Sequence, residues 1–401
     1  MNKNCQNCNN NFIITEDDQQ FYAKIDVPIP SFCPDCRLQR RLAFRNERIL
    51  YWKNCDLCKK KMVSLYHEDS PYTVYCQKCW WSDNWDPMEY GQEYDFKKPF
   101  FEQFDKLQKK VPRYNKCIIT ALNAEDSDFS NFILHSKSCV LSFSILSSEN
   151  IFYSNQIDKS NDCFDCFNIK KCEVIYENIN SENNYKTNFL LNSRNCIESC
   201  FLFNSNNCNN CFMSVNLRNK RFVIKNKQYS EKGYFNELKK LNLGSYKELL
   251  KLKRDFNNMI KKSLHKYSNI IKSYNCEGDN ILNSKDLKNC FYAEDSENIK
   301  FGYRFLLLKD SMDIAFAIGN NIYETFSTGT QSSAQKFCEE SADSSRVQYC
   351  QILINSSDAF GCIGLRNKQY CILNKQYTKQ EYEELVPKII SHMNEMPYIS
   401  S

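Results

Sequence analysis

The sequence predicts a mainly β protein in which an N-terminal zinc-ribbon module precedes a duplicated, short-period β-solenoid of the parallel β-helix type, with capping and connecting α-helices. Three observations support this fold class. Four Cys-x-x-Cys pairs fall between Cys5 and Cys79. Short apolar stretches bounded by Ser, Asn or Asp then recur with a 12-residue period. Finally, a segment that begins at Leu217 returns at Leu365, an offset of 148 residues.

Size and composition set the frame for these motifs. The 401 residues allow two or three domains, and 42% hydrophobic residues suffice for their cores. The sequence has no run of eighteen apolar residues, and its start, MNKNCQNCNNNF, lacks the apolar core of a signal peptide. We therefore expect a cytoplasmic protein with no membrane partner. In that reducing compartment, 23 cysteines are more typical of metal ligands and small core residues than of disulfides.

The four Cys-x-x-Cys pairs predict two Zn²⁺ ions per chain. A structural zinc site needs four soft ligands in a tetrahedron, and each such turn offers two thiolates. The spacing between pairs suits zinc ribbons, in which short strands carry the turns. Sequential pairing is favoured, and interleaved pairing, with the first and third turns on one metal, is the alternative. The expected ligands are Cys5, Cys8, Cys33 and Cys36 for one ion and Cys55, Cys58, Cys76 and Cys79 for the other.

A basic segment, residues 37–61, runs between the two cysteine sets and carries a net charge of +7 in a chain whose total is +5. Several of its arginines follow helical spacing, and we expect their side chains to be exposed. Arginine makes forked contacts with phosphate, so the segment is a candidate nucleic-acid surface. The alternative is a solvated helical face, or arginines that pair with nearby acidic residues. The candidate contacts are Arg37, Arg40, Arg41, Arg45, Arg48 and Lys53.

Aromatic residues follow the last cysteine pair. Trp80, Trp81 and Trp85, together with a helix expected from about Pro99 to Lys110, indicate an apolar clasp that fills a small core. Because seven of the nine prolines lie at or before Pro112, we expect a boundary there. The predicted first domain is the double zinc-ribbon module with this clasp, residues 1–112.

The remainder of the chain is predicted to be solenoid. Each 12-residue unit is typical of a strand followed by a turn, and stacked units bury their inward residues against one another. Either a 12-residue or a 24-residue coil fits this period. A helix is expected from about Ser245 to Ile270. The predicted parts are a first solenoid half at 113–229, a helical connector at 230–275, a second half at 276–377, and a C-terminal helix and tail at 378–401.

Most of the fifteen later cysteines lie inside these units. We interpret them as core residues, since cysteine is small and apolar. The alternative is a further metal site at Cys163 and Cys166, or at Cys208 and Cys211, where the front spacing recurs.

Several motifs together carry a family resemblance: the cysteine turns, CRLQRRLAFRNER, CWWSDNWDP, LRNKQYCILNKQY and the doubled body. Over nearly its whole length the chain resembles uncharacterised zinc-ribbon proteins of small-genome bacteria, which carry Cys-rich β-solenoid repeats behind the ribbons. Some members bear an automatic CoA-transferase-type label, which no nucleotide-binding glycine loop or catalytic acid in this sequence supports. The resemblance implies an architecture rather than an activity.

Three classes of function compete. The favoured one is a non-enzymatic zinc-binding protein that contacts nucleic acid or a ribonucleoprotein through its basic module. The alternative is a protein–protein interaction scaffold in which zinc is purely structural. A β-solenoid enzyme is less favoured, because neither paired carboxylates at a repeated strand position nor a histidine-based site is apparent. We therefore expect no catalytic residues.

Overall fold

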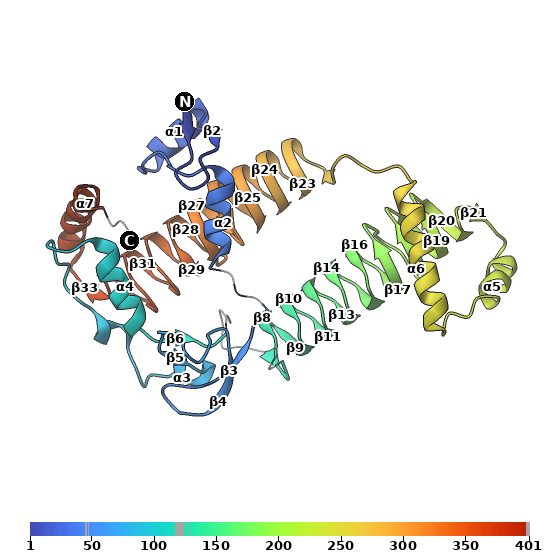
Figure 1. Ribbon diagram of the computed structural model, residues 1–401, viewed down its shortest axis with the longest axis horizontal. Helices are drawn as coiled ribbons and strands as arrows, with labels where there is room; N and C mark the ends of the chain where they lie inside the picture. The colour runs from blue at the N-terminus through green and yellow to red at the C-terminus, as the bar shows by residue number, and fades with distance from the viewer. Residues whose placement is uncertain (45, 47, 117–123, 128, 398–401) are drawn as a thin grey trace.

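The protein is described by a computed structural model that covers residues 1–44, 46, 48–116, 124–127 and 129–397. Two solenoids of parallel strands lie side by side, and two small cysteine-bearing lobes pack against them (Figure 1). The predicted mainly β class is confirmed. No helix among the described residues is long and apolar enough to cross a membrane.

The two lobes are built from short elements. The first lobe contains β1 (Asn2–Asn4), β2 (Asn11–Ile13), α1 (Glu16–Lys24) and α2 (Pro34–Leu42). The second contains β3 (Tyr51–Asn54), β4 (Lys61–Ser64), β5 (Val74–Tyr75), α3 (Gln77–Trp80), the 3₁₀ helix η1 (Pro87–Tyr90), α4 (Phe100–Lys110) and β6 (Arg113–Tyr114). The helix predicted at Pro99–Lys110 is confirmed as α4.

The first solenoid consists of fifteen described strands. They are β7 (Ala124–Glu125), β8 (Asn131–Leu134), β9 (Ser136–Val140), β10 (Phe143–Leu146), β11 (Glu149–Phe152), β12 (Asn155–Asp158), β13 (Asn161–Phe164), β14 (Phe167–Lys170), β15 (Glu173–Tyr176), β16 (Ile179–Glu182), β17 (Tyr185–Leu191), β18 (Cys200–Phe203), β19 (Asn206–Val215), β20 (Arg218–Ile224) and β21 (Lys227–Gln228).

The second solenoid consists of twelve described strands. They are β22 (Ile270–Ile271), β23 (Tyr274–Leu282), β24 (Lys285–Glu294), β25 (Glu297–Leu306), β26 (Leu308–Ala315), β27 (Gly319–Thr328), β28 (Ser333–Lys336), β29 (Glu339–Ser341), β30 (Ser345–Gln348), β31 (Ser357–Phe360), β32 (Gln369–Ile372) and β33 (Lys375–Gln376).

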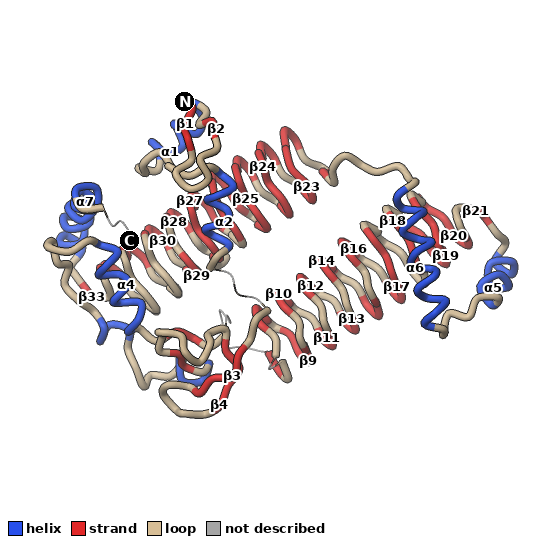
Figure 2. Tube along the Cα trace, viewed as in Figure 1, coloured by secondary structure: helices blue, strands red, loops and turns tan. Residues whose placement is uncertain are grey.

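The strand register sets the length of a coil. Phe143 pairs in parallel with Asn155, and Glu149 pairs with Asn161, so each strand lies beside the strand one sequence period later. The coil is therefore the 12-residue one, which decides between the two lengths that the sequence allowed. From β8 to β16 of the first solenoid, each coil holds two short strands with turns between them (Figure 2).

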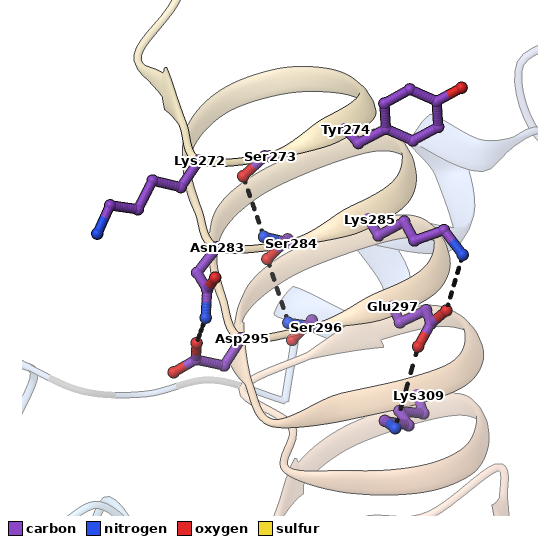
Figure 3. A pocket seen from close by; sticks show the side chains of 10 residues that line it. All are labelled: Lys272, Ser273, Tyr274, Asn283, Ser284, Lys285, Asp295, Ser296, Glu297 and Lys309. Carbon is purple, nitrogen blue, oxygen red and sulfur yellow. Dashed lines mark hydrogen bonds and ion pairs between the residues drawn. The ribbon is translucent and has the colours of Figure 1, made fainter.

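Inside the coils, every third residue points inward. Ile151, Ser154, Ile157, Ser160 and Cys163 are at most 2% exposed, whereas most of the residues between them are not buried. The inward serines form hydrogen-bonded columns along the axis. In the second solenoid the N–H of Ser284 donates to Oγ of Ser273 at 3.0 Å, and the N–H of Ser296 donates to Oγ of Ser284 at 3.1 Å (Figure 3). Each of these backbone amides is thus hydrogen-bonded to a serine hydroxyl of the neighbouring coil.

The duplication predicted from the sequence has a clear structural counterpart. Each solenoid ends in an antiparallel hairpin, β20–β21 in the first and β32–β33 in the second, with Val223 opposite Gln228 and Cys371 opposite Gln376. A capped helix follows each hairpin. These helices are α5 (Glu231–Lys239), which starts after Ser230, and α7 (Lys379–Glu395), which starts after Thr378. Thr378 and Glu381 form a capping box at the start of α7.

The helix expected to reach Ile270 is shorter than predicted. It is α6 (Tyr246–Lys261), and residues 270–271 form strand β22 instead. Leu252 and Phe256 on α6 are buried against the aromatic residues of β18 and β19. The sequence after Lys261 continues with Ser263, His265 and Tyr267, which do not extend the apolar face of the helix.

The two solenoids run in opposite directions. The first leads away from the second lobe, and the second returns toward it (Figure 1). Lys170 contacts Glu294 at 2.8 Å, and Arg304 reaches Ser144 at 3.4 Å, so higher residue numbers on one arm meet lower ones on the other. The second lobe bridges the ends, because its Trp52 ring packs 5.6 Å from Phe129 of the first arm and its core continues into Phe360 of the second.

Replacing a repeat cysteine tests its role as a core residue. Cys196 is 0% exposed, and its neighbour Ile197 is 42% exposed. We expect Cys196→Ala to lower the free energy of unfolding by roughly 1–2 kcal/mol, because it leaves a small cavity. The control Ile197→Ala should change it by less than about 0.5 kcal/mol. Urea unfolding measures both. Loss of a zinc ion on Cys196→Ala would contradict the core assignment.

Candidate metal centres

The first cysteine cluster combines a turn and a helix start. Cys5 and Cys8 lie in the turn between β1 and β2, while Cys33 is the N-cap of α2 and Cys36 lies in its first turn. All four sulfurs lie within 4.8 Å of one another, and Sγ of Cys8 is 3.8 Å from Sγ of Cys33. The cluster thus joins two segments of the chain that are well separated in sequence.

The second cluster repeats this geometry. Cys55 and Cys58 lie in the turn between β3 and β4, and Cys76 is the N-cap of α3, which carries Cys79. Its four sulfurs also lie within 4.8 Å of one another, and Sγ of Cys58 is 3.9 Å from Sγ of Cys76. Sequential pairing of the turns is therefore confirmed. One feature differs from the expected ribbon: the second pair of each cluster begins a helix instead of lying on strands.

Both clusters fit a zinc ion. Sulfurs bound at about 2.3 Å in a tetrahedron lie about 3.8 Å from each other, which agrees with the observed separations. Hydrogen bonds also favour the thiolate form. The backbone N–H of Cys33 donates to Sγ of Cys5 and that of Cys76 to Sγ of Cys55, both at 3.2 Å. The chain thus provides two Cys₄ sites, and zinc there would have a structural role because all four positions are protein ligands.

Backbone N–H donors lower the pKa of one cysteine in each cluster. Burial would raise the pKa of Cys5, but backbone N–H groups at Cys33, Cys8 and Asn7 outweigh it and lower the pKa to about 6. A backbone hydrogen bond from Lys60 is the largest of the effects that lower the pKa of Cys58 to about 7. A thiolate at neutral pH is the form that binds metal.

The repeat cysteines differ in surroundings. Cys166 and Cys172 are buried, and burial raises the pKa of each thiol to about 12. Among the described residues, Cys163 with Cys166 and Cys208 with Cys211 belong to no set of three or more ligands that could hold a metal. These positions lie in the inward columns, which supports packing over ligation.

The arginines of α2 do not face solvent as expected. Arg37 and Arg41 are 2% and 3% exposed, and Arg40 alone is half exposed. The expectation of exposed side chains is therefore wrong for the two buried arginines. Helix α2 also ends at Leu42, so Arg48 lies outside it, and Arg45 lies outside the described residues.

Two carboxylates of the second solenoid hold these arginines. Nε of Arg37 lies 2.9 Å from Asp313, Arg41 lies 3.3 Å from Asp313, and Arg40 lies 3.0 Å from Glu324. Both acids are buried, and burial raises the pKa of Asp313 to about 6, although Arg41 and Arg37 oppose this shift. Because the two guanidinium groups stay charged, we expect Asp313 to be ionised at neutral pH. The cluster fixes the first lobe on β26 and β27.

The remaining predicted cations lie nearer the surface. Arg48 is exposed with its guanidinium 6.0 Å from the ring of Phe143, and Nζ of Lys53 donates to the carbonyl of Glu68 at 3.0 Å. These two residues thus differ from Arg37, Arg40 and Arg41, which pair with carboxylates of the second solenoid. The acidic partners Asp313 and Glu324 were not among the predicted site residues.

The second lobe is held by polar and aromatic contacts together. Arg113 is 4% exposed; it donates to Oε1 of Gln351 at 2.7 Å, and its guanidinium lies 4.4 Å from the ring of Tyr72. Arg366 donates to the carbonyl of Trp80 at 3.0 Å and lies 5.1 Å from the ring of Trp85. The aromatic clasp predicted around these tryptophans therefore packs the lobe onto the last coils of the second solenoid.

A surface hollow at the start of the second solenoid offers no comparable site. Its charged side chains pair along the coils, with Lys285 3.2 Å and Lys309 4.0 Å from Glu297, and Asn283 donates to Asp295 (Figure 3). These pairs extend the repeat and satisfy one another. The hollow therefore shows how outward residues stack, and the side chains that line it do not converge as catalytic groups would.

Comparison with known proteins agrees with the first cluster. Residues 1–45 match the family described as a probable treble clef domain. No curated protein matches the chain. A cysteine turn followed by a helix that carries the second cysteine pair is what the structure shows in this region, and the second lobe repeats it. The wider likeness to solenoid-bearing bacterial proteins stays a prediction.

Metal analysis tests the two sites separately. We expect the purified chain to contain two zinc ions, and Cys33→Ser or Cys76→Ser to contain one, because three thiolates hold zinc less well and each site folds its own lobe. Cys163→Ser, in the inward column, is the matched control and should keep both ions. Fewer than one zinc ion in the parent protein would contradict the assignment.

The ion cluster on α2 can be tested by stability. Arg41→Gln leaves buried carboxylates short of a partner, and we expect it to lower the free energy of unfolding by about 3–5 kcal/mol. Arg40→Gln removes a half-exposed pair and should cost about 1 kcal/mol or less. Urea unfolding at neutral pH gives both values, with zinc content unchanged. Equal effects of the two substitutions would contradict the burial of this cluster.

Proposed function

We propose that the protein is a non-enzymatic scaffold that binds other proteins, with zinc in a purely structural role. One observation carries this proposal: the arginines of the basic segment that best suited phosphate bind Asp313 and Glu324 of the same chain. Their donors stabilise the attachment of the first lobe. Three of the nine cations in the segment are therefore engaged in an internal contact.

The placement of both metal lobes supports the same proposal. Each lobe packs on a solenoid through a core that includes residues of both, with Cys33 and Tyr323 in one core and Trp80 and Phe360 in the other. A structural zinc ion stabilises a lobe too small to fold on its own core. In this arrangement zinc supports braces that fix the two arms, and the long outer faces of the arms are the surfaces offered to partners.

Contact with nucleic acid is the competing function, and two cations keep it testable. Arg48 and Lys53 lie near the surface of the second lobe. If they bind phosphate, Arg48→Gln with Lys53→Gln should weaken binding and lower its salt dependence by about 0.7–0.9 per lost contact. The scaffold proposal expects no salt-dependent affinity of the full chain for single- or double-stranded nucleic acid.

Copurification from native cells, with and without nuclease, decides between the two functions. The scaffold proposal expects the same protein partner in both preparations, and the partner should be lost after Cys33→Ser if the braced arms are needed. Recovery of RNA or DNA, with loss of the partner after nuclease treatment, would overturn the proposal. Cys163→Ser, which keeps both metal sites, is the control for general destabilisation.

A further inference from the structure

One outer face of the first solenoid carries a row of aromatic side chains. The register places Phe152 beside Phe164, and Phe164 beside Tyr176, on β11, β13 and β15. The rings of Phe152 and Phe164 stack with centroids 4.6 Å apart and planes 12° apart. The adjacent corner positions hold Leu141 and Tyr153. We call these five residues the outer aromatic strip.

The strip is open to solvent. Tyr153 is 59% exposed, Leu141 45%, Phe164 42% and Tyr176 36%. The polar contacts that the first solenoid makes with the second come from the other set of strands, at Ser144 and Lys170. Exposed apolar residues in one continuous row mark an interaction surface more often than scattered ones do.

Beyond Tyr176, α6 covers the column of corner positions to which Leu141 and Tyr153 belong. That column continues to Phe189 and Phe201, whose rings stack at 4.4 Å, and Phe256 of α6 packs 5.4 Å from Phe201. Lys253 of α6 lies 4.9 Å from the Phe189 ring and forms a 2.6 Å ion pair with Glu177. A helix with apolar residues and a cation is therefore what this surface binds within the chain.

The duplication relates the strip to the surface that seats α2. At the offset of 148 residues, Asp165 corresponds to Asp313. Likewise Tyr176–Glu177 repeats the dipeptide Tyr323–Glu324 within one residue of that offset. The second solenoid uses Asp313 and Glu324 to hold the arginines of α2. In the first solenoid Glu177 already pairs with Lys253 of α6, whereas Asp165 is exposed and has no ion pair among the described residues.

The charge around the strip is complementary to such a helix. Asp165 occupies the corner position next to Phe164 and is exposed, whereas Glu177, next to Tyr176, pairs with Lys253 of α6. A hydrogen bond with Glu177, with burial and the charge of Asp165 adding to it, raises the pKa of Tyr176 to about 12. The strip thus combines exposed aromatic rings with one carboxylate, Asp165, that has no ion pair among the described residues.

We propose that the outer aromatic strip binds an amphipathic helix of a partner protein that bears Arg or Lys on successive turns, seated as α2 is seated on the second solenoid. The proposal rests on the scaffold function and names its binding surface. Aromatic side chains of the strip would pack on the apolar side of the helix, and Asp165 would pair with a cation. Two seats of the same origin would then hold one helix in cis and one in trans.

Peptide selection on the full, zinc-loaded chain tests this proposal. The probe is a display library of 20-residue peptides. Selected peptides should have apolar residues at helical spacing with Arg or Lys beside them. Their affinity should fall about tenfold or more for Phe164→Ser with Asp165→Lys, because a ring contact and an ion pair are lost together. Peptides that are acidic or lack helical spacing would overturn the proposal.

A matched control lies on the neighbouring face of the same coils. Val174 is 42% exposed, and Asp162 is an outward residue of β13. Val174→Ser with Asp162→Lys makes the same changes in apolarity and charge beside the strip, and the selected peptides should keep their affinity for it. Equal loss in both variants would overturn the proposal. Circular dichroism and zinc content confirm that both variants are folded.

Two further outcomes separate this proposal from the scaffold function. If a copurified protein partner stays bound to Phe164→Ser with Asp165→Lys, the scaffold function stands and the strip is not its site. If the chain sediments as a dimer that this variant dissociates, the strip is occupied by a second copy, and the proposed partner helix is wrong. A partner lost in this variant, and retained in the Val174 and Asp162 control, supports both proposals.

Discussion

The structure depends on the closure of each 12-residue coil, with an inward side chain at every third position. Between the inward residues, corner residues such as Tyr153 and Lys159 adopt φ values of 54° and 48°. A left-handed conformation costs about 1–2 kcal/mol for a residue other than glycine. Ladder hydrogen bonds and stacked inward side chains offset this cost, coil after coil. The same register also aligns the outward residues, so equivalent side chains of successive coils form straight rows on each outer face.

Much of this architecture could be predicted because its signals are local or repeated. The four thiol pairs are close in sequence, and the hairpins at Leu217 and Leu365 are near copies. The period alone cannot give the coil length, because a 12-residue coil with two strands and a 24-residue coil with four have the same period. The signal that decides it is the spacing of three between inward residues, as in Ile151, Ser154 and Ile157. Asn and Asp, frequent in this chain, tolerate the corner conformation well.

The role of the basic segment could not be predicted for a different reason. Arg37 and Asp313 lie in distant parts of the sequence, and nothing near either residue indicates the other. A local charge sum of +7 therefore suggested a surface for phosphate. In the folded chain, Asp313 and Glu324 stand at corners of successive coils, which places them together under one turn of α2. Because the two acids occupy equivalent corners of neighbouring coils, the fold of the solenoid places them side by side as a buried pair.

The ends of the solenoids show how one surface takes helices from different parts of the chain. Phe360 of the second arm corresponds to Phe212 of the first, and these positions pack against α4 and α6 respectively. Helix α2 takes a third seat, and it begins at a zinc ligand. Lobes of this size lose their fold without metal. Release of zinc from the first site would leave Asp313 and Glu324 side by side without their arginines. Two buried carboxylates without partners destabilise the coils that carry them. The first metal site is thus coupled to the second solenoid through charge.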